Sequence, residues 1–95
     1  MINLKLMKCG IWEAWESARV ARAAGLRLMI GGMIESRLAM GCGAHLASGL
    51  GGFEFIDLDT PLWFSRDPMV GPPEIGRGGF YDLSKVRSGI GCRPR

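Results

Sequence analysis

The sequence has few cysteines and no long hydrophobic run. Its 95 residues contain three cysteines, Cys9, Cys42 and Cys92, with neither the even number of a disulfide framework nor the close spacing of a metal site. No run approaches the roughly 18 apolar residues that a membrane-spanning helix requires. The N-terminal order of charged and apolar residues differs from that of a signal peptide. These absences predict reduced thiols and a cytoplasmic protein with no membrane partner.

The sequence also lacks a nucleic-acid-binding motif, although its net charge is +3. Arg87, Arg93 and Arg95 make the C-terminus basic, but no aromatic side chains alternate with them. We therefore expect a solvated tail and no nucleic-acid partner. With 47% hydrophobic residues, the chain is long enough for one small domain with a modest core.

Hydrophobic periodicity predicts three strands and two helices in the order β-α-β-α-β. The strands are expected at residues 2–8, 26–30 and 53–58, and the helices at residues 11–24 and from residue 35 or 36 to residue 48. Gly25 and Gly49 are the expected helix stops. Strands joined by helical crossovers are parallel, with right-handed connections, so the predicted fold class is α/β.

Beyond Thr60, prolines and glycines interrupt regular structure, and residues 80–83 are expected to form a short strand or turn. We therefore divide the chain into residues 1–60, which hold the main strands and helices, and residues 61–95, an irregular covering tail of the same domain. Three parallel strands with helices on one side leave two unpaired edges and a bare face. The chain is thus expected to be a slice of something larger.

Charged residues stand at two of the predicted strand ends. Lys5 lies near the end of the first strand, and Asp57 and Asp59 lie at the end of the third. Because side chains alternate along a strand, the two aspartates are expected on one face. Two carboxylates there suit a cation such as an ammonium group, whereas an aspartate before Thr60-Pro61 is also a common cap or turn residue. The residues alone leave both interpretations open.

Three segments resemble a known family, in its order and nearly its spacing: NLKLMKCG at residues 3–10, IGGMIES at residues 30–36 and DLDTPL at residues 57–62. They resemble the last third of the enolase superfamily barrel, in particular its muconate-lactonizing subgroup and, within it, the dipeptide epimerases of the L-Ala-D/L-Glu type. The resemblance covers residues 2–91 and implies strands six to eight of a TIM-type (β/α) barrel. One departure is in the first loop, where the family has two glycines after the second lysine and this chain has only Gly10.

The resemblance implies a reaction for this site. Lys5 matches an acid/base lysine of an enzyme that removes a proton α to a carboxylate, gives an enediolate held by Mg²⁺, and returns a proton from the opposite face. A lysine acts as a base near neutral pH when burial or nearby positive charge lowers its pKa. Asp57 and Asp59 match the pair that receives the free α-ammonium of the dipeptide, through charge-assisted hydrogen bonds.

The resemblance also assigns residues after the second strand. The family's seventh strand ends in residues that line the substrate pocket, and they match Gly32, Met33 and Ile34. Taken alone, Glu35 is more typical of a helix N-terminus, where its charge favours the helix dipole. Lys8 is expected to face outward or border the loop, and His45, in the middle of a helix, is expected to be packed or capping.

Several parts of the family's machinery match nothing in this chain. Its metal carboxylates come from strands three, four and five, and its other acid/base lysine comes from strand two. The resemblance therefore implies Mg²⁺ as the cofactor of the complete enzyme, with no metal ligand here. It implies a dipeptide substrate and, as partners, the remainder of the barrel and a capping domain. The 95 residues alone are expected to be inactive.

Two other functions remain open. One is another enzyme of the same subgroup, such as an N-acylamino acid racemase, a cycloisomerase or an o-succinylbenzoate synthase. The aspartate pair argues against these, because their substrates have no free ammonium group. The other is a non-catalytic module that pairs its open sheet edges with another chain. The sequence does not indicate which dipeptide is bound.

Overall fold

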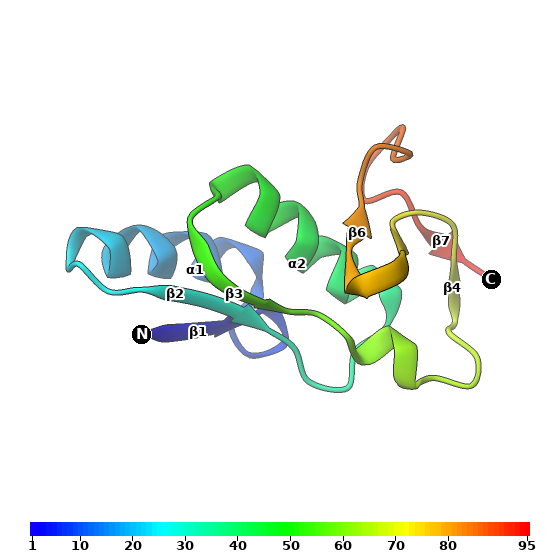
Figure 1. The fold of residues 1–95 in the computed structure, drawn as a ribbon, viewed down its shortest axis with the longest axis horizontal. Helices are drawn as coiled ribbons and strands as arrows, with labels where there is room; N and C mark the ends of the chain where they lie inside the picture. Colours follow the sequence, from blue (N-terminus) through cyan, green and yellow to red (C-terminus); the bar gives the residue numbers. More distant parts are fainter.

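The structure is a computed structural model that describes residues 1–95, and its main elements follow the predicted order β-α-β-α-β (Figure 1). These elements are β1 (Ile2–Lys5), α1 (Leu6–Ala23), β2 (Leu28–Gly31), α2 (Arg37–Leu50) and β3 (Phe53–Asp57). The three strands form one parallel sheet in the order β1-β2-β3. The predicted parallel α/β arrangement is confirmed.

Both helices cover the same face of the sheet, and no element covers the other face (Figure 1). The core lies between this face and the helices, and it is built from large aliphatic side chains on the strands and mostly small ones on the helices. One cluster joins the sheet to α1 through Leu4, Leu28, Ala18 and Ala21, and a second joins it to α2 through Ile30, Leu58, Met40, Ala44 and Ala47. Small helix residues let the backbones approach the sheet closely. Neither helix has an apolar stretch that would cross a membrane.

The first strand is shorter than predicted. It ends at Lys5, not at residue 8, because residues 6–9 form a helical turn that precedes the main part of α1. Gly10 interrupts this turn with a positive φ of 76°, a conformation that glycine adopts without strain. The continuous helix therefore starts at Ile11, as the apolar spacing predicts.

The two helices end differently from each other. Gly25 stops α1 as predicted: its φ is 71°, its amide donates to the Arg22 carbonyl, and the Leu26 amide donates to the Ala21 carbonyl, which is a Schellman motif. The predicted stop of α2 at Gly49 is wrong, since the helix continues to Leu50. It ends at Gly51, which has a φ of 61°.

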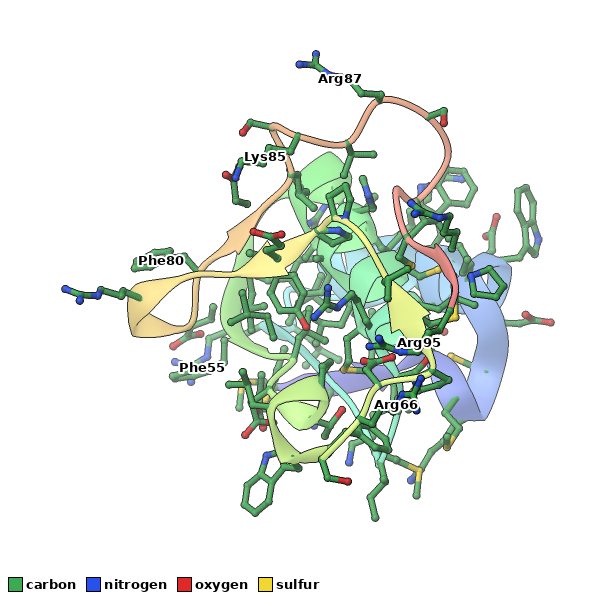
Figure 2. The ribbon with its side chains drawn as sticks, turned by 90° about the vertical axis from the view of Figure 1, so that its right-hand side faces the viewer. Phe55, Arg66, Phe80, Lys85, Arg87 and Arg95 are labelled. Atoms are coloured by element: carbon green, nitrogen blue, oxygen red, sulfur yellow. The ribbon has the colours of Figure 1, made fainter.

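The tail folds as short pieces. Two ribbons of two residues per strand form antiparallel pairs: β4 (Met69–Val70) with β7 (Arg93–Pro94), and β5 (Glu74–Ile75) with β6 (Tyr81–Asp82). Two 3₁₀ turns, η1 (Thr60–Trp63) and η2 (Arg77–Gly79), complete it. The short strand expected within residues 80–83 is present as β6. Arg87 extends from the tip of a loop, well apart from Arg95 (Figure 2), so the basic residues of the tail do not form one cluster.

Asp67 attaches the tail to the start of α2. Asp67 is 8% exposed, and its carboxylate accepts hydrogen bonds from the Arg37 amide at 2.9 Å and from the Met69 amide at 2.8 Å. Its carbonyl accepts from Arg95 Nε at 3.2 Å. Ser36, at the N-cap position, makes no side-chain cap bond, so a residue thirty positions away caps this helix.

We predict that Asp67→Ala destabilises the chain by about 2 kcal/mol, because two backbone amides lose a buried acceptor. Asp67→Asn retains one acceptor oxygen and should lose about half of that amount. Urea unfolding followed by circular dichroism measures both. Asp82→Ala is the matched control, because its exposed carboxylate bonds only to nearby Ser84 and its removal should move the midpoint little. Equal effects at Asp67 and Asp82 would contradict the role of Asp67.

Candidate functional site

The C-terminal ends of the three strands place two charged residues in one row. Lys5 on β1 is opposite Gly31 on β2, and Gly31 is opposite Asp57 on β3. Neighbouring strands are about 4.8 Å apart, so the Cα atoms of Lys5 and Asp57 are separated by about 10 Å. The row thus holds a cation, a gap without a side chain, and an anion.

This row faces the uncovered side of the sheet. Leu4 and Ile30 belong to the adjacent row and are buried against the helices. Because side chains alternate, Lys5 and Asp57 point away from the helices. Phe55, two residues before Asp57, shares this orientation and is 49% exposed; Figure 2 shows it at the outer side of the sheet. A ligand lying over the bare face would meet both charged groups.

Asn3 is a further polar residue of this face. A Cβ added to Gly31 would lie 3.0 Å from Asn3 Oδ1 and 3.2 Å from Nδ2, so the amide of Asn3 leans over the gap between Lys5 and Asp57. The sequence pattern does not single out Asn3. Its position two residues before Lys5 in a strand is the signal that indicates the same face.

The two aspartates line one small cavity. It has a volume of about 220 Å³ and lies between the end of β3, η1 and the β5–β6 ribbon, with Leu62 and Tyr81 also in its wall. The strand ends at Asp57, one residue earlier than predicted, so the two aspartates do not share a strand face as expected. Asp59 instead precedes η1 with φ −86° and ψ −12°, and it still reaches the same cavity.

Asp59 also serves the turn that follows it. Its carbonyl accepts from the Leu62 amide at 2.9 Å, and its Oδ2 accepts from Trp63 Nε1 at 3.2 Å. The structure therefore supports the turn interpretation of Asp59 without excluding a ligand, because a carboxylate has lone pairs for several donors. Asp57 has no protein hydrogen bond of this kind and is exposed to the cavity.

Tyr81 closes the side of this cavity. Its hydroxyl donates to the Leu58 carbonyl at 2.6 Å, between the two aspartates in sequence. Burial raises the pKa of Tyr81 to about 12, and the nearby Asp59 contributes in the same direction, whereas Arg37 opposes it. The neutral phenol thus holds the end of β3 in place.

The raised pKa of Tyr81 predicts a loss of stability at alkaline pH. Above pH 10 the unfolded chain releases the phenol proton while the folded chain keeps it until about pH 12, so the free energy of unfolding falls across this window. We expect about 1–2 kcal/mol, discounted because the ring is half-buried. Tyr81→Phe should remove this pH-dependent part and cost about 1 kcal/mol at pH 7. Guanidinium unfolding at pH 7, 10 and 12 compares the two; parallel pH profiles would contradict the assignment.

The loop after β2 holds the other predicted binding residues. Met33 and Ile34 are 43% and 81% exposed, at the C-terminal edge of the sheet. Gly32 faces the core: a Cβ added to Gly32 would lie 2.6 Å from Met40 Cε and 3.3 Å from Glu35 Oε2. The backbone therefore runs directly over the core here, and only glycine fits without displacing Met40.

Gly32→Ala should destabilise the chain by about 1–3 kcal/mol, because the new methyl group must displace the fully buried Met40 side chain. Gly49→Ala is the matched control. It lies inside α2 with nothing within 4 Å of its added Cβ, so it should gain up to about 1 kcal/mol. Thermal unfolding of both variants tests the pair, and a neutral Gly32→Ala would show that the core is looser than described.

Other candidates have structural surroundings. The predicted first strand includes Lys8. This residue lies instead in the helical turn before Gly10, where it is exposed. His45 Nε2 lies 3.2 Å from the Ile90 carbonyl, which agrees with a packed histidine. Glu35 lies two residues before the first residue of α2 and is 4% exposed, so it is a buried residue of the loop that leads into the helix.

The chain does not form a metal centre by itself. No three His, Cys, Asp or Glu side chains come together in a group that could hold a metal ion. Asp57 and Asp59 offer carboxylates but lack the further oxygen ligands that Mg²⁺ requires. The donors present therefore do not fit Mg²⁺, but as carboxylates they can accept hydrogen bonds.

The fold and the charged row define a class of protein: a part of a parallel (β/α) barrel that carries its polar groups at the C-terminal strand ends, where such barrels hold their active sites. A family model for Enolase C-terminal domain-like proteins matches residues 1–95. The chain belongs to this family.

Relatives of known activity agree with this assignment. The chain is 58% identical over 86 residues to an aromatic dipeptide epimerase from Herpetosiphon aurantiacus, covering 90% of this chain and 24% of the relative. It is 48% identical over 97 residues to an L-Ala-D/L-amino acid epimerase from Populus trichocarpa, covering 90% of this chain and 23% of the relative. The chain thus spans about a quarter of the length of these curated relatives.

Solved structures show the same match. A mandelate racemase/muconate lactonizing enzyme from Roseiflexus sp. superposes with a TM-score of 0.91 and 54% identity, over 98% of this chain and 27% of that one. The dipeptide epimerase from Cytophaga hutchinsonii, in complex with Mg and the dipeptide D-Ala-L-Val, gives a TM-score of 0.87 and 34% identity, over 98% of this chain and 25% of that one. Homologues of this chain are therefore epimerases, and one of these structures contains Mg.

Proposed function

We propose that this chain supplies the acid/base lysine and the ammonium-binding carboxylates of a dipeptide epimerase. One observation carries the proposal: the parallel register puts Lys5 and Asp57 on the same bare face, at opposite ends of one row. The relatives named above are epimerases of dipeptides or L-Ala-amino acid substrates, which have a free ammonium group and a terminal carboxylate.

The geometry suits an extended dipeptide. The α-ammonium would lie beside Asp57 and Asp59 at the end of β3 and donate charge-assisted hydrogen bonds to both. The second residue of the dipeptide would then extend across Gly31 toward β1, where Lys5 would move a proton at its α carbon. Gly32, Met33 and Ile34 would form the wall beside it.

The remaining parts would come from outside these 95 residues. The outer edges of β1 and β3 are unpaired, so we propose that further barrel strands pair with both, with a capping domain over the strand ends. Residues 1–60 would be the barrel portion and residues 61–95 its cover. Mg²⁺, when bound in the complete enzyme, would stabilise the negative charge that forms on the substrate carboxylate; this chain would not ligate it.

A complete barrel tests the function. The test uses a chimera in which residues 1–95 replace the corresponding segment of the Herpetosiphon aurantiacus aromatic dipeptide epimerase. NMR then measures the exchange of the α-hydrogen of dipeptides with D₂O in the presence of Mg²⁺. Lys5→Ala should abolish exchange from one substrate configuration. Asp57→Asn should raise KM by about 10- to 100-fold, the value of a lost charged hydrogen bond. Lys8→Ala, exposed and outside the row, is the control.

An N-acetylated dipeptide separates this function from that of an N-acylamino acid racemase. It lacks the ammonium group, so it should react at least tenfold more slowly than the free dipeptide. Equal turnover of the two substrates, together with an unchanged KM in the Asp57→Asn variant, would show that the aspartates do not bind an ammonium group.

A further inference from the structure

The two loops that form the candidate site are joined by one side chain. Thr60 Oγ1, at the start of η1, donates to the Glu35 carbonyl at 3.0 Å. The Glu35 amide in turn donates to Thr60 Oγ1 at 3.4 Å. Both main-chain groups of one residue are thus satisfied by one hydroxyl group. No other side-chain hydrogen bond joins the loop after β2 to η1.

Glu35 carries this connection to the wall of the site. Its side chain is buried, and Oε2 accepts from the Met33 amide at 2.7 Å. The same oxygen would lie 3.3 Å from a Cβ at Gly32. The Met33 amide is therefore held by the Glu35 carboxylate, which also lies beside Gly32, and the Glu35 main chain is held by Thr60.

The other end of the connection is the carboxylate pair. Thr60 follows Asp59 directly, and η1 has no buried side chain to hold it by packing. Leu62 and Trp63 in the same turn are 63% and 79% exposed. The buried Leu58 anchors the chain just before Asp59, and beyond it the position of η1 relative to Met33 depends on polar contacts, of which the Thr60 hydroxyl is the one that spans the two loops.

We propose that Thr60 is a positioning residue that sets the spacing between the ammonium-binding carboxylates and the loop at residues 32–34. This inference rests on the proposed function, and it assigns to Thr60 a part that composition and motif do not indicate. The hydroxyl does not touch the reacting atoms. It keeps the two binding groups at a separation that one dipeptide can span, where a displacement of about 1 Å is enough to weaken binding and turnover substantially.

Two variants separate the effect of the hydroxyl group from that of the methyl group. Thr60→Val keeps the branched shape and removes the donor and acceptor, whereas Thr60→Ser keeps the hydroxyl and removes a methyl group. In the complete barrel described above, Thr60→Val should raise KM for the free dipeptide about tenfold and lower kcat by less than threefold. Thr60→Ser should restore both values to within about twofold of the original.

Amide hydrogen exchange gives a readout that does not depend on activity. Thr60→Val should increase the exchange rate at Met33 and Glu35 by about tenfold or more and leave the amides of β2 unchanged, since only the loop loses a partner. Unchanged exchange at both residues, or equal loss of substrate binding in the Val and Ser variants, would overturn the proposal. Absence of dipeptide turnover in the unsubstituted barrel would instead contradict the proposed function, independently of the exchange result.

Discussion

Parallel pairing of β1, β2 and β3 brings the polar groups of this chain to one edge of one sheet face. Each crossover helix returns the chain to the end of the sheet where the previous strand began, so all three strands run in one direction and end at the same edge. Their last residues are therefore paired with one another. Lys5, Gly31 and Asp57 occupy that row as a direct result. The hydrophobic rows beneath fix the same register, since a shift by one residue would turn Leu4 and Ile30 to the bare face.

The loops at the ends of the strands and helices are positioned by polar contacts, whereas the sheet is positioned by apolar packing. Long-range polar contacts position them: Asp67 caps the start of α2, Tyr81 binds the Leu58 carbonyl, and Thr60 binds Glu35. Arg22 of α1 likewise donates to the carbonyls of Leu50 and Gly51 at the end of α2. Each such bond satisfies a backbone group that would otherwise lose its partner at a helix or strand end. The apolar core determines the register, and the polar contacts determine the shape of the site.

The sequence predicts what depends on local periodicity. Alternation and helical spacing place the strands and helices in order, whereas the shared face of Lys5 and Asp57 is known only from the register of the folded sheet. The errors lie where a glycine does not act as expected: Gly49 continues α2, and the turn before Gly10 shortens β1. Asp67 and Thr60 were not predictable as anchoring residues. Their roles depend on partners that lie close only after folding, and a serine, threonine or aspartate in a loop has many possible local partners.

The proposed function also accounts for the lack of a group of three metal-binding side chains in this part of the barrel. In the proposed function, a dipeptide that bridged Asp57 and Lys5 would lie across the bare face, and its terminal carboxylate would point over the interior, away from the 95 residues described. A cation that bound this carboxylate would then take its protein ligands from the opposite wall, whose strands would continue the sheet from the unpaired edges of β1 and β3. The carboxylates present here are instead available for an ammonium group. The division follows from electrostatics: acidic ligands that surround a divalent cation and acidic ligands that receive an ammonium group repel each other, and placing them on opposite sides of the barrel separates the two sets of negative charge.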